Sequence, residues 1–390
     1  MSESVALSRE QLAALRVQLR DAQSAASTTQ RQPAPAKTPA TPPQLSIIFF
    51  SGLGQERAPY DLLLDVARFV DEAGFHAIWT PERHFTLVGG AYPNPAVLAA
   101  ALAGMTRKVR LRAGSINLPL HDPLRVAEEW AVVDNLSNGR VDLALAPGWH
   151  VRDFVLKPEN FQKKFDMLNQ YCEQLQQVWR GQPVTRLDAY GHPHAILTYP
   201  RPLQPELPLW LTTSQREEAW EYAGRQGFNI LSALINFGPK DLEKRIGIYR
   251  CARQAAGLDP STGVVSLMLH TYVGADTDEA IETVRPALTE YLKSFVSQHQ
   301  GANQADASDK VKTLQSLGDD SADFIDMVFA RYVGTSSLIG DVVQARRILE
   351  RFRVMGVDEV ACLVDFGLDK HTVIDSLSRL SQLTCEDTRR

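Results

Sequence analysis

From Leu45 onward the chain alternates between short apolar runs and longer segments whose apolar residues recur every three or four positions. The run LSIIFF at 45–50 is almost continuously apolar, which is typical of a strand buried on both faces. Residues 60–73 then carry apolar side chains at helical spacing, and Gly74 follows them as glycine often follows a helix. With the next apolar run, FHAIW at 75–79, this pattern predicts a strand, a helix and a second strand.

The same alternation continues to the C-terminal region. Further strands are predicted at 109–116, 141–147, 207–213, 228–234, 266–274 and 358–366, and helices at 122–136, 159–179, 215–225, 240–256, 277–296 and 342–355. Repeated βα units of this number predict an α/β fold, a (β/α)8 TIM barrel. The alternative is a doubly wound open sheet, but SGLGQER after the first strand lacks the third glycine of its usual G-x-G-x-x-G. Loop-rich insertions at 181–208 and 297–333 are expected to cover the active-site end of the barrel.

Residues 1–44 differ from this pattern. Residues 1–20 predict a short amphipathic helix with Leu12, Leu15 and Leu19 on one face, and residues 21–44, rich in proline and alanine, predict a linker. Residues 45–390 then form the barrel domain. The helix is either a frayed surface helix or a docking element for a partner protein.

Composition narrows the class of protein. The formal net charge is −5 and the charges are interspersed, so the basic stripe of a nucleic-acid-binding protein is missing. The four cysteines lie far apart without a C-x-x-C, which favours reduced thiols in the cytoplasm over disulfides or a zinc site. No apolar stretch is long enough for a membrane helix, and we expect neither a membrane nor a nucleic-acid partner.

Active sites of TIM barrels are built from residues just past the carboxyl ends of the strands. The second predicted strand is followed directly by Glu82, Arg83 and His84, a cluster that we take as the candidate catalytic group. Neither a hydrolase motif nor a metal-ligand spacing accompanies it, so no metal is expected. The other strand ends carry small, hydroxyl and aromatic residues, which suit a flat, phosphate-bearing cofactor. These candidate cofactor-binding residues are Ser51, Gly114, Ser115, Asn117, Pro147, Gly148, Trp149, Thr213 and Ser214.

Two long strings resemble bacterial luciferase-like flavin monooxygenases. They are TPERHFTLVGGAYPNPAVLAAALAGMT and RAGSINLPLHDPLRVAEEWAVVDNLSNGRVDLALAPGW, and the likeness extends over nearly the whole barrel domain. MLHTYVGAD and the last predicted strand look more specifically like the natural-product subgroup, whose members act beside or within non-ribosomal peptide and polyketide assembly lines.

This resemblance implies a cytoplasmic homodimer that receives reduced FMN from a separate flavin reductase. It would react the flavin with O2 and transfer one oxygen atom to an aminoacyl, peptidyl or polyketide chain on a carrier protein. Two alternatives stay open. One is an enzyme that oxidises a free small molecule with FMN or a deazaflavin, and the other is a flavin-binding partner without turnover.

The resemblance also assigns roles to single residues. Gly114–Ser115 matches the place where luciferases hold a non-prolyl cis peptide under the flavin. Pro147–Gly148 matches a loop that lies beside the flavin, and Thr213–Ser214 matches the region that holds the flavin phosphate. The hydroxyls of this last pair could also only cap the next helix. Luciferases carry Glu-His-His where this chain has Glu82, Arg83 and His84, and their first histidine is the catalytic one. The guanidinium group of arginine stays protonated because its pKa is above about 12, so Arg83 cannot accept a proton as a base. Arg83 is therefore expected to stabilise an anion, and His84 to donate the proton. The alternative is that a Glu82–Arg83 ion pair only ties the loop down.

Overall fold

The computed structural model describes residues 41–52, 58–86, 88–234, 238–302 and 329–384. The chain divides into two compact units, residues 1–34 and 35–390, and the description below concerns the second unit. The predicted helix at 1–20 and nearly all of the predicted linker at 21–44 lie outside the described residues, as does most of the insertion predicted at 297–333.

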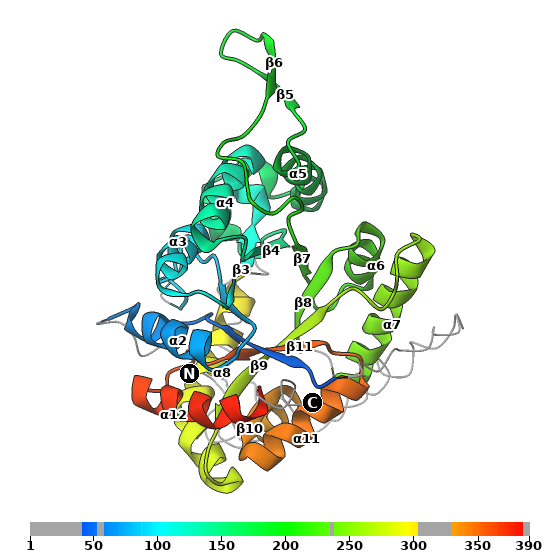
Figure 1. The fold of residues 1–390 in the computed structure, drawn as a ribbon. Coiled ribbons are helices and arrows are strands. Elements are labelled where there is room, and N and C mark those ends of the chain that lie inside the picture. Colours follow the sequence, from blue (N-terminus) through cyan, green and yellow to red (C-terminus); the bar gives the residue numbers. More distant parts are fainter. Residues whose placement is uncertain (1–40, 53–57, 87, 235–237, 303–328, 385–390) are drawn as a thin grey trace, which may run out of the picture. The chain divides into compact units, whose positions relative to one another are not determined.

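Eight parallel strands close into a barrel (Figure 1). Each strand pairs with the next along the chain, and the last strand pairs with the first. The strands are β1 (Gln44–Ile48), β2 (Ala77–Thr80), β3 (Arg110–Asn117), β4 (Val141–Ala146), β7 (Leu209–Thr212), β8 (Asn229–Ala233), β9 (Val265–Val273) and β11 (Glu359–Leu363). All eight predicted strands are thus present, and the predicted TIM barrel is confirmed. A further strand, β10 (Ser337–Gly340), pairs with β9 outside the closed ring.

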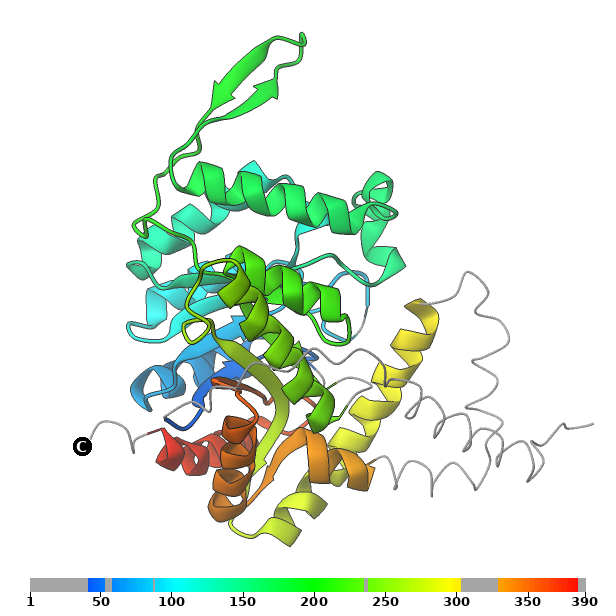
Figure 2. The same cartoon turned by 90° about the vertical axis from the view of Figure 1, so that its right-hand side faces the viewer.

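Helices surround the barrel (Figures 1 and 2). They are α2 (Asp61–Glu72), α3 (Pro95–Met105), α4 (Pro123–Ser137), α5 (Lys164–Trp179), α6 (Glu217–Gln226), α7 (Pro239–Ala255), α8 (Thr277–Ala302), α11 (Val342–Val354) and α12 (Lys370–Leu380). The short 3-10 helices are η1 (Leu118–Leu120), η2 (Val151–Val155), η3 (Pro158–Asn160) and η4 (Ser381–Leu383). Among the helices of the described residues, none combines the length and apolarity that crossing a membrane requires.

Helices α3 and α12, and regular structure within the insertion at 181–208, were not predicted from the sequence. The sequence of α3, PAVLAAALAGM, is apolar at nearly every position, so it shows no polar stripe, although Asn94 caps its first turn. The insertion contains an antiparallel hairpin of β5 (Val184–Leu187) and β6 (Pro193–Ile196), which extends away from the barrel strands in both views (Figure 2).

The amino-terminal half of the barrel interior is filled by a buried charge network. The guanidinium of Arg112 donates to Asp142 at 2.5 Å and to Glu359 at 2.8 and 2.9 Å. The rings of Trp79 and Trp210 lie over the same guanidinium, at 4.6 and 4.5 Å from their centroids. This half of the barrel is therefore closed by protein side chains, and a ligand has room only at the opposite end. We call that end, where the strands have their carboxyl ends, the mouth.

Candidate active site

The loop after β2 places the Glu82 carboxylate, which is almost fully buried, at the mouth. Its Oε1 accepts from the Nε2 atoms of His84 at 2.7 Å and His121 at 2.6 Å, and its Oε2 accepts from the Asn117 N–H at 2.7 Å. Because a carboxylate can only accept, both imidazoles donate through Nε2–H. Glu82 thereby fixes the orientation of His84 and leaves its Nδ1 to exchange a proton with a reacting group.

Glu82 is held as an anion by these donors. Burial alone would raise its pKa, but the hydrogen bonds from His121, His84 and Asn117 lower the pKa overall. Burial likewise acts to lower the pKa of His121, and the bond to Glu82 outweighs it, so that the pKa is raised. The carboxylate oxygens are thus used by two imidazoles and a backbone amide, which corrects the alternative of a Glu82–Arg83 ion pair.

Arg83 lies in an aromatic slot beside this cluster. Its guanidinium carbon lies 4.9 Å from the centroid of Phe50 and 5.3 Å from that of Trp149. Burial lowers the pKa of Arg83, while Tyr291 and Asp153 act in the opposite direction. A guanidinium remains charged in such a site, so Arg83 provides a positive charge screened from water at the mouth.

Asp153, a residue that the sequence analysis missed, faces the same cluster from η2. Its side chain is buried, and burial raises its pKa to about 6, although His84 and Arg83 act to lower it. A carboxyl group with this pKa can give or take a proton close to neutral pH. The only signal in the sequence is its position in GWHVRDF, just past the end of the fourth strand.

Asp365 holds two loops of the mouth together. Its carboxylate accepts from the N–H groups of Phe50, Ser51 and Gly52 at 2.8–3.0 Å, and from the Tyr92 hydroxyl at 3.0 Å. The Tyr92 carbonyl in turn accepts from the Arg83 N–H at 2.9 Å. Ser51, predicted to bind the cofactor, therefore belongs to the loop that Asp365 fixes, and its hydroxyl donates to the Asp365 carbonyl.

The carboxyl end of β3 provides a small-residue surface. The peptide bond between Gly114 and Ser115 is cis, as the resemblance implies, and Gly114 pairs with Ala144 of β4. A β-carbon at position 114 would lie 3.1 Å from the Trp79 side chain, a spacing tight enough to require the neighbour to give way. Glycine at this position therefore lets the Trp79 side chain pack directly against the β3 backbone beside the cis peptide.

The loop after β4 carries three of the predicted cofactor-binding residues. Gly148 has φ of +75°, and a β-carbon there would lie 2.9 Å from the Phe154 ring, so glycine is required. The next residue, Trp149, was expected to bind the cofactor, and in the structure its ring packs against the Arg83 guanidinium. Pro147 is half-buried, just beyond the end of β4.

The end of β7 differs in one respect from the prediction. Helix α6 begins at Glu217 with Arg216 as its N-cap, so Thr213 and Ser214 precede the helix and do not cap it. The Thr212 hydroxyl, however, is buried without a hydrogen-bond partner among the described residues. Nearby, Arg245 of α7 donates to the Gln215 carbonyl at 3.1 Å. A hydroxyl with unused hydrogen-bonding capacity and a cation beside the turn fit the phosphate end of a flavin mononucleotide.

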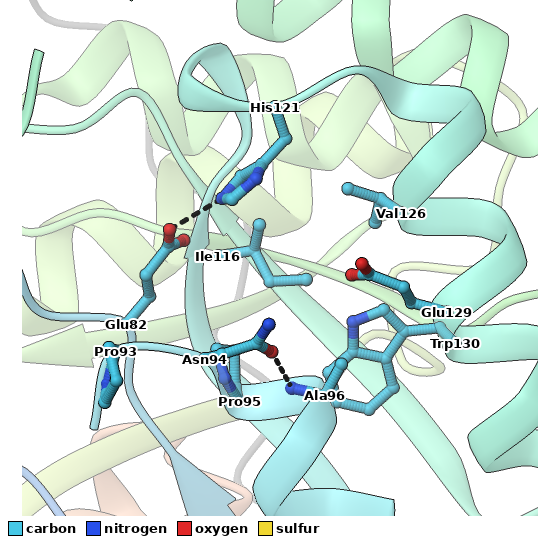
Figure 3. A pocket seen from close by; sticks show the side chains of 10 residues that line it. All are labelled: Glu82, Pro93, Asn94, Pro95, Ala96, Ile116, His121, Val126, Glu129 and Trp130. Carbon is cyan, nitrogen blue, oxygen red and sulfur yellow. Dashed lines mark hydrogen bonds and ion pairs between the residues drawn. The ribbon is translucent and has the colours of Figure 1, made fainter. Parts of the chain in front are cut away.

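A small cavity adjoins the Glu82–His121 pair on the side of α3 and α4 (Figure 3). Its volume is about 20 Å³, and Asn94, Ile116 and Trp130 are among the residues that line it. This volume accommodates one water molecule and not a flavin. We therefore place the cofactor by the strand ends, and the cavity serves at most to bring water to the Glu82 network.

The chain belongs to the luciferase-like monooxygenase family, whose model matches residues 10–359. It is 25% identical over 327 residues to the oxygenase component of a flavin-dependent trigonelline monooxygenase from Acinetobacter baylyi, covering 82% of this chain and 88% of the relative. The predicted enzyme class, a flavin-dependent monooxygenase of the luciferase-like type, is therefore confirmed at the level of the family.

Solved structures share the fold. Monooxygenase RslO1 from Streptomyces bottropensis has a TM-score of 0.71 at 22% identity, covering 87% of this chain and 98% of its own. The oxygenating constituent of 3,6-diketocamphane monooxygenase from Pseudomonas putida, solved with FMN, has a TM-score of 0.70 at 18% identity and covers 89% and 99%.

Proposed function

We propose that this protein is the oxygenase component of a two-component monooxygenase that uses reduced FMN and O2. The observation that carries the proposal is the cluster of buried Glu82 and Arg83 with partly buried His84 at the mouth of a luciferase-like barrel, together with the small residues and the cis peptide at Gly114–Ser115. The name of the Acinetobacter relative, an oxygenase component, supports a separate flavin reductase as partner.

The residues of the mouth divide the work. Gly114, Ser115 and Gly148 would support the ring system of FMN, and Thr212 and Arg245 would hold its phosphate. When bound and reduced, FMN supplies the two electrons with which one atom of O2 enters the substrate and the other leaves as water.

Protons and charge are handled by the cluster on the β2 side. His84 would take a proton on Nδ1 from solvent or Asp153 and then deliver it to the reacting oxygen, while its Nε2–H stays hydrogen-bonded to Glu82 and keeps the ring in place. Arg83 would stabilise negative charge that develops on oxygen, as a preorganised cation in a site that excludes water. Asp153, with its raised pKa of about 6, would exchange protons between the cluster and solvent.

Cofactor choice is tested by anaerobic calorimetric titration with reduced FMN, oxidised FMN, FAD and a deazaflavin. We expect the tightest binding for reduced FMN. Thr212→Val should weaken the binding of FMN and spare that of riboflavin, which lacks the phosphate. Equal affinity for FAD and FMN, or for FMN and riboflavin, would count decisively against a site closed around one phosphate.

The proposed substrate is an acyl chain carried on a carrier protein. Support comes from the natural-product resemblance and from residues 1–44, which would dock on a partner and raise the effective concentration of the carrier. Deleting residues 1–44 should raise KM for a carrier-bound substrate and leave FMN affinity, melting temperature and activity on a soluble mimic nearly unchanged. Identical kinetics on the carrier-bound substrate would remove the docking role.

We further propose a homodimer formed through α3 and α4, which lie next to each other (Figure 1). Val97 of α3 and Val132 and Leu136 of α4 are 65%, 43% and 58% exposed, an unusual degree for large apolar side chains on adjacent helices. Light scattering should give the mass of a dimer for the full chain and of a monomer for Leu136→Lys. A monomeric full chain at working concentration would reject the dimer.

A further inference from the structure

His270 points into the barrel at the mouth. On the same strand, the Ser266 hydroxyl donates to Glu359 of the interior charge network, so the side chain of Ser266 faces inward. Successive side chains of a strand alternate between its faces, and His270, four residues further along β9, therefore faces inward as well. Its place near the carboxyl end of β9 puts it at the mouth, although the site described above does not use it.

Aromatic rings surround this imidazole. The ring centroids of Tyr291, Phe366 and Tyr332 lie 4.3, 5.2 and 5.3 Å from that of His270, and the imidazole is 2% exposed. Its Nδ1 lies 2.6 Å from the Tyr332 hydroxyl oxygen. Its Nε2 is buried and has no hydrogen-bond partner among the described residues. Buried polar atoms are nearly always paired, so an unpaired one in an enzyme interior indicates a place where a ligand supplies the partner.

The free nitrogen is a donor. A phenol hydroxyl donates more readily than an imidazole N–H, and an imidazole nitrogen accepts more readily than a phenol oxygen, so Tyr332 donates to Nδ1 and the ring proton stays on Nε2. Burial lowers the pKa of His270 to about 3, which keeps the imidazole neutral. A neutral donor among aromatic rings suits an uncharged acceptor such as a carbonyl oxygen, because a carboxylate would lose its hydration there without gaining an opposite charge.

His270 lies on a different strand from the candidate flavin residues. Those residues lie on or after β3, β4 and β7, whereas β9 pairs with β8 and β11, so β8 lies between β7 and β9. Tyr291, which contacts His270, also lies near enough to Arg83 of the catalytic cluster to influence its pKa.

We propose that His270 recognises the substrate by donating Nε2–H to a carbonyl oxygen of an acyl chain, whose apolar part packs against Tyr291 and Phe366. The Tyr291 ring packs edge-on against the imidazole, with centroids 4.3 Å apart, so we expect binding of the acyl chain to include a shift of the Tyr291 ring. The inference rests on the proposed function and adds the recognised group to it.

The test uses two amide variants of the full-length protein. Glutamine can place its side-chain nitrogen, a donor, near the position of Nε2, and asparagine can place its side-chain oxygen, an acceptor, near that of Nδ1. His270→Gln therefore keeps the proposed substrate donor, and His270→Asn keeps only the contact with Tyr332. The probes are the N-acetylcysteamine thioester of octanoic acid and the matching S-octyl thioether, which lacks the carbonyl. Affinities for both probes are measured with each variant.

We expect the unmodified protein to bind the thioester about tenfold more tightly than the thioether, a preference that His270→Gln keeps and His270→Asn loses. Loss in both variants supports the proposal only if Tyr332→Phe keeps the preference, because that change leaves Nε2 in place. Three outcomes overturn the proposal. The first is a preference that survives in His270→Asn, and the second is a preference that is lost in Tyr332→Phe as well as in both amide variants. The third is an unmodified protein that shows no preference for the thioester.

Failure of this inference is distinguishable from failure of the proposed function. The anaerobic titration with reduced FMN tests the function and should give the same affinity for the unmodified protein and the His270 variants. Normal FMN binding without a role for His270 rejects only the substrate contact. Failure of the unmodified protein to bind FMN rejects the function itself.

Discussion

The two halves of the barrel interior both contain buried charge, but they treat it differently. In the amino-terminal half, Arg112 is surrounded by Asp142 and Glu359, and the pKa of each carboxyl group is lowered, since the guanidinium outweighs the effect of full burial. At the mouth, burial raises the pKa values of Asp153 and Asp365, although hydrogen bonds lower that of Glu82. The Thr212 hydroxyl and the His270 Nε2 lack hydrogen-bond partners among the described residues, as does the Trp210 Nε1 beside Arg112.

This difference separates structure from chemistry inside one core. A network whose donors and acceptors satisfy one another stabilises the fold and has nothing left for a ligand. A carboxyl group whose pKa burial raises toward neutral pH, or a polar atom without a partner at the mouth, keeps proton-transfer or hydrogen-bonding capacity for a reaction. Substitutions in the two halves should therefore change different properties, activity at the mouth and stability in the amino-terminal half.

The largest effect is expected for His84→Ala. Loss of a positioned proton donor should lower product formation by roughly 10²–10⁴ and increase the share of O2 released as hydrogen peroxide, while the melting temperature changes little. Product yield and peroxide are measured per FMN oxidised, with His371→Ala as control, because the His371 side chain is 86% exposed on α12. Unchanged yield in His84→Ala would assign His84 a purely structural part.

Arg112→Met should have the opposite signature. Removing the shared cation leaves the buried Glu359 carboxylate without its guanidinium and Asp142 with Arg110 alone, which we expect to cost roughly 3–5 kcal/mol of unfolding free energy. Any activity of the folded fraction should persist. Denaturant unfolding measures the loss, and Arg125→Met, which removes a surface pair with Glu129, should change stability by less than about 1 kcal/mol. Equal stability of the two variants would contradict a structural role for the network.

The barrel was predictable from sequence because each of its eight strands is an apolar run and most of its helices are amphipathic. Helix α3 escaped prediction because it is apolar all round, so that packing against the barrel rather than a polar stripe marks it. Helix α12 carries Val373, Leu377 and Leu380 at helical spacing, so its pattern was present in the sequence and was overlooked.

The site was predictable only where its residues adjoin in sequence. Glu82, Arg83 and His84 are consecutive, but His121, which shares the Glu82 oxygen with His84, lies 39 residues away from Glu82. Asp365 reaches the Phe50 N–H across 315 residues. Contacts of this kind exist only once the barrel closes, so no local spacing could indicate them.

Asp153→Asn should give the smallest effect and sharpens the contrast through its dependence on pH. The carboxyl group binds its proton more tightly in the folded protein, with a pKa of about 6 against the ordinary value of 3.8. Its contribution to stability is thus fully present below the unfolded pKa and is lost as pH rises through the folded value. The asparagine side chain does not titrate, so the variant should gain stability relative to the unmodified protein between about pH 4 and 7, by at most about 3 kcal/mol.

Thermal unfolding at a series of pH values measures this gain, and the charged groups that face Asp153 are His84, Arg83 and Glu82. Since they also titrate or are charged, the informative quantity is the difference between the two proteins and not either curve alone. Glu173→Gln, the same chemical change at an exposed position of α5, should leave that difference flat. In Asp153→Asn, the rate of product formation should also no longer change with pH near pH 6, the pKa of the Asp153 carboxyl group. A stability difference that does not vary with pH would mean that Asp153 is ionised like an ordinary surface carboxylate, and the mouth would then lose its main difference from the amino-terminal half of the barrel.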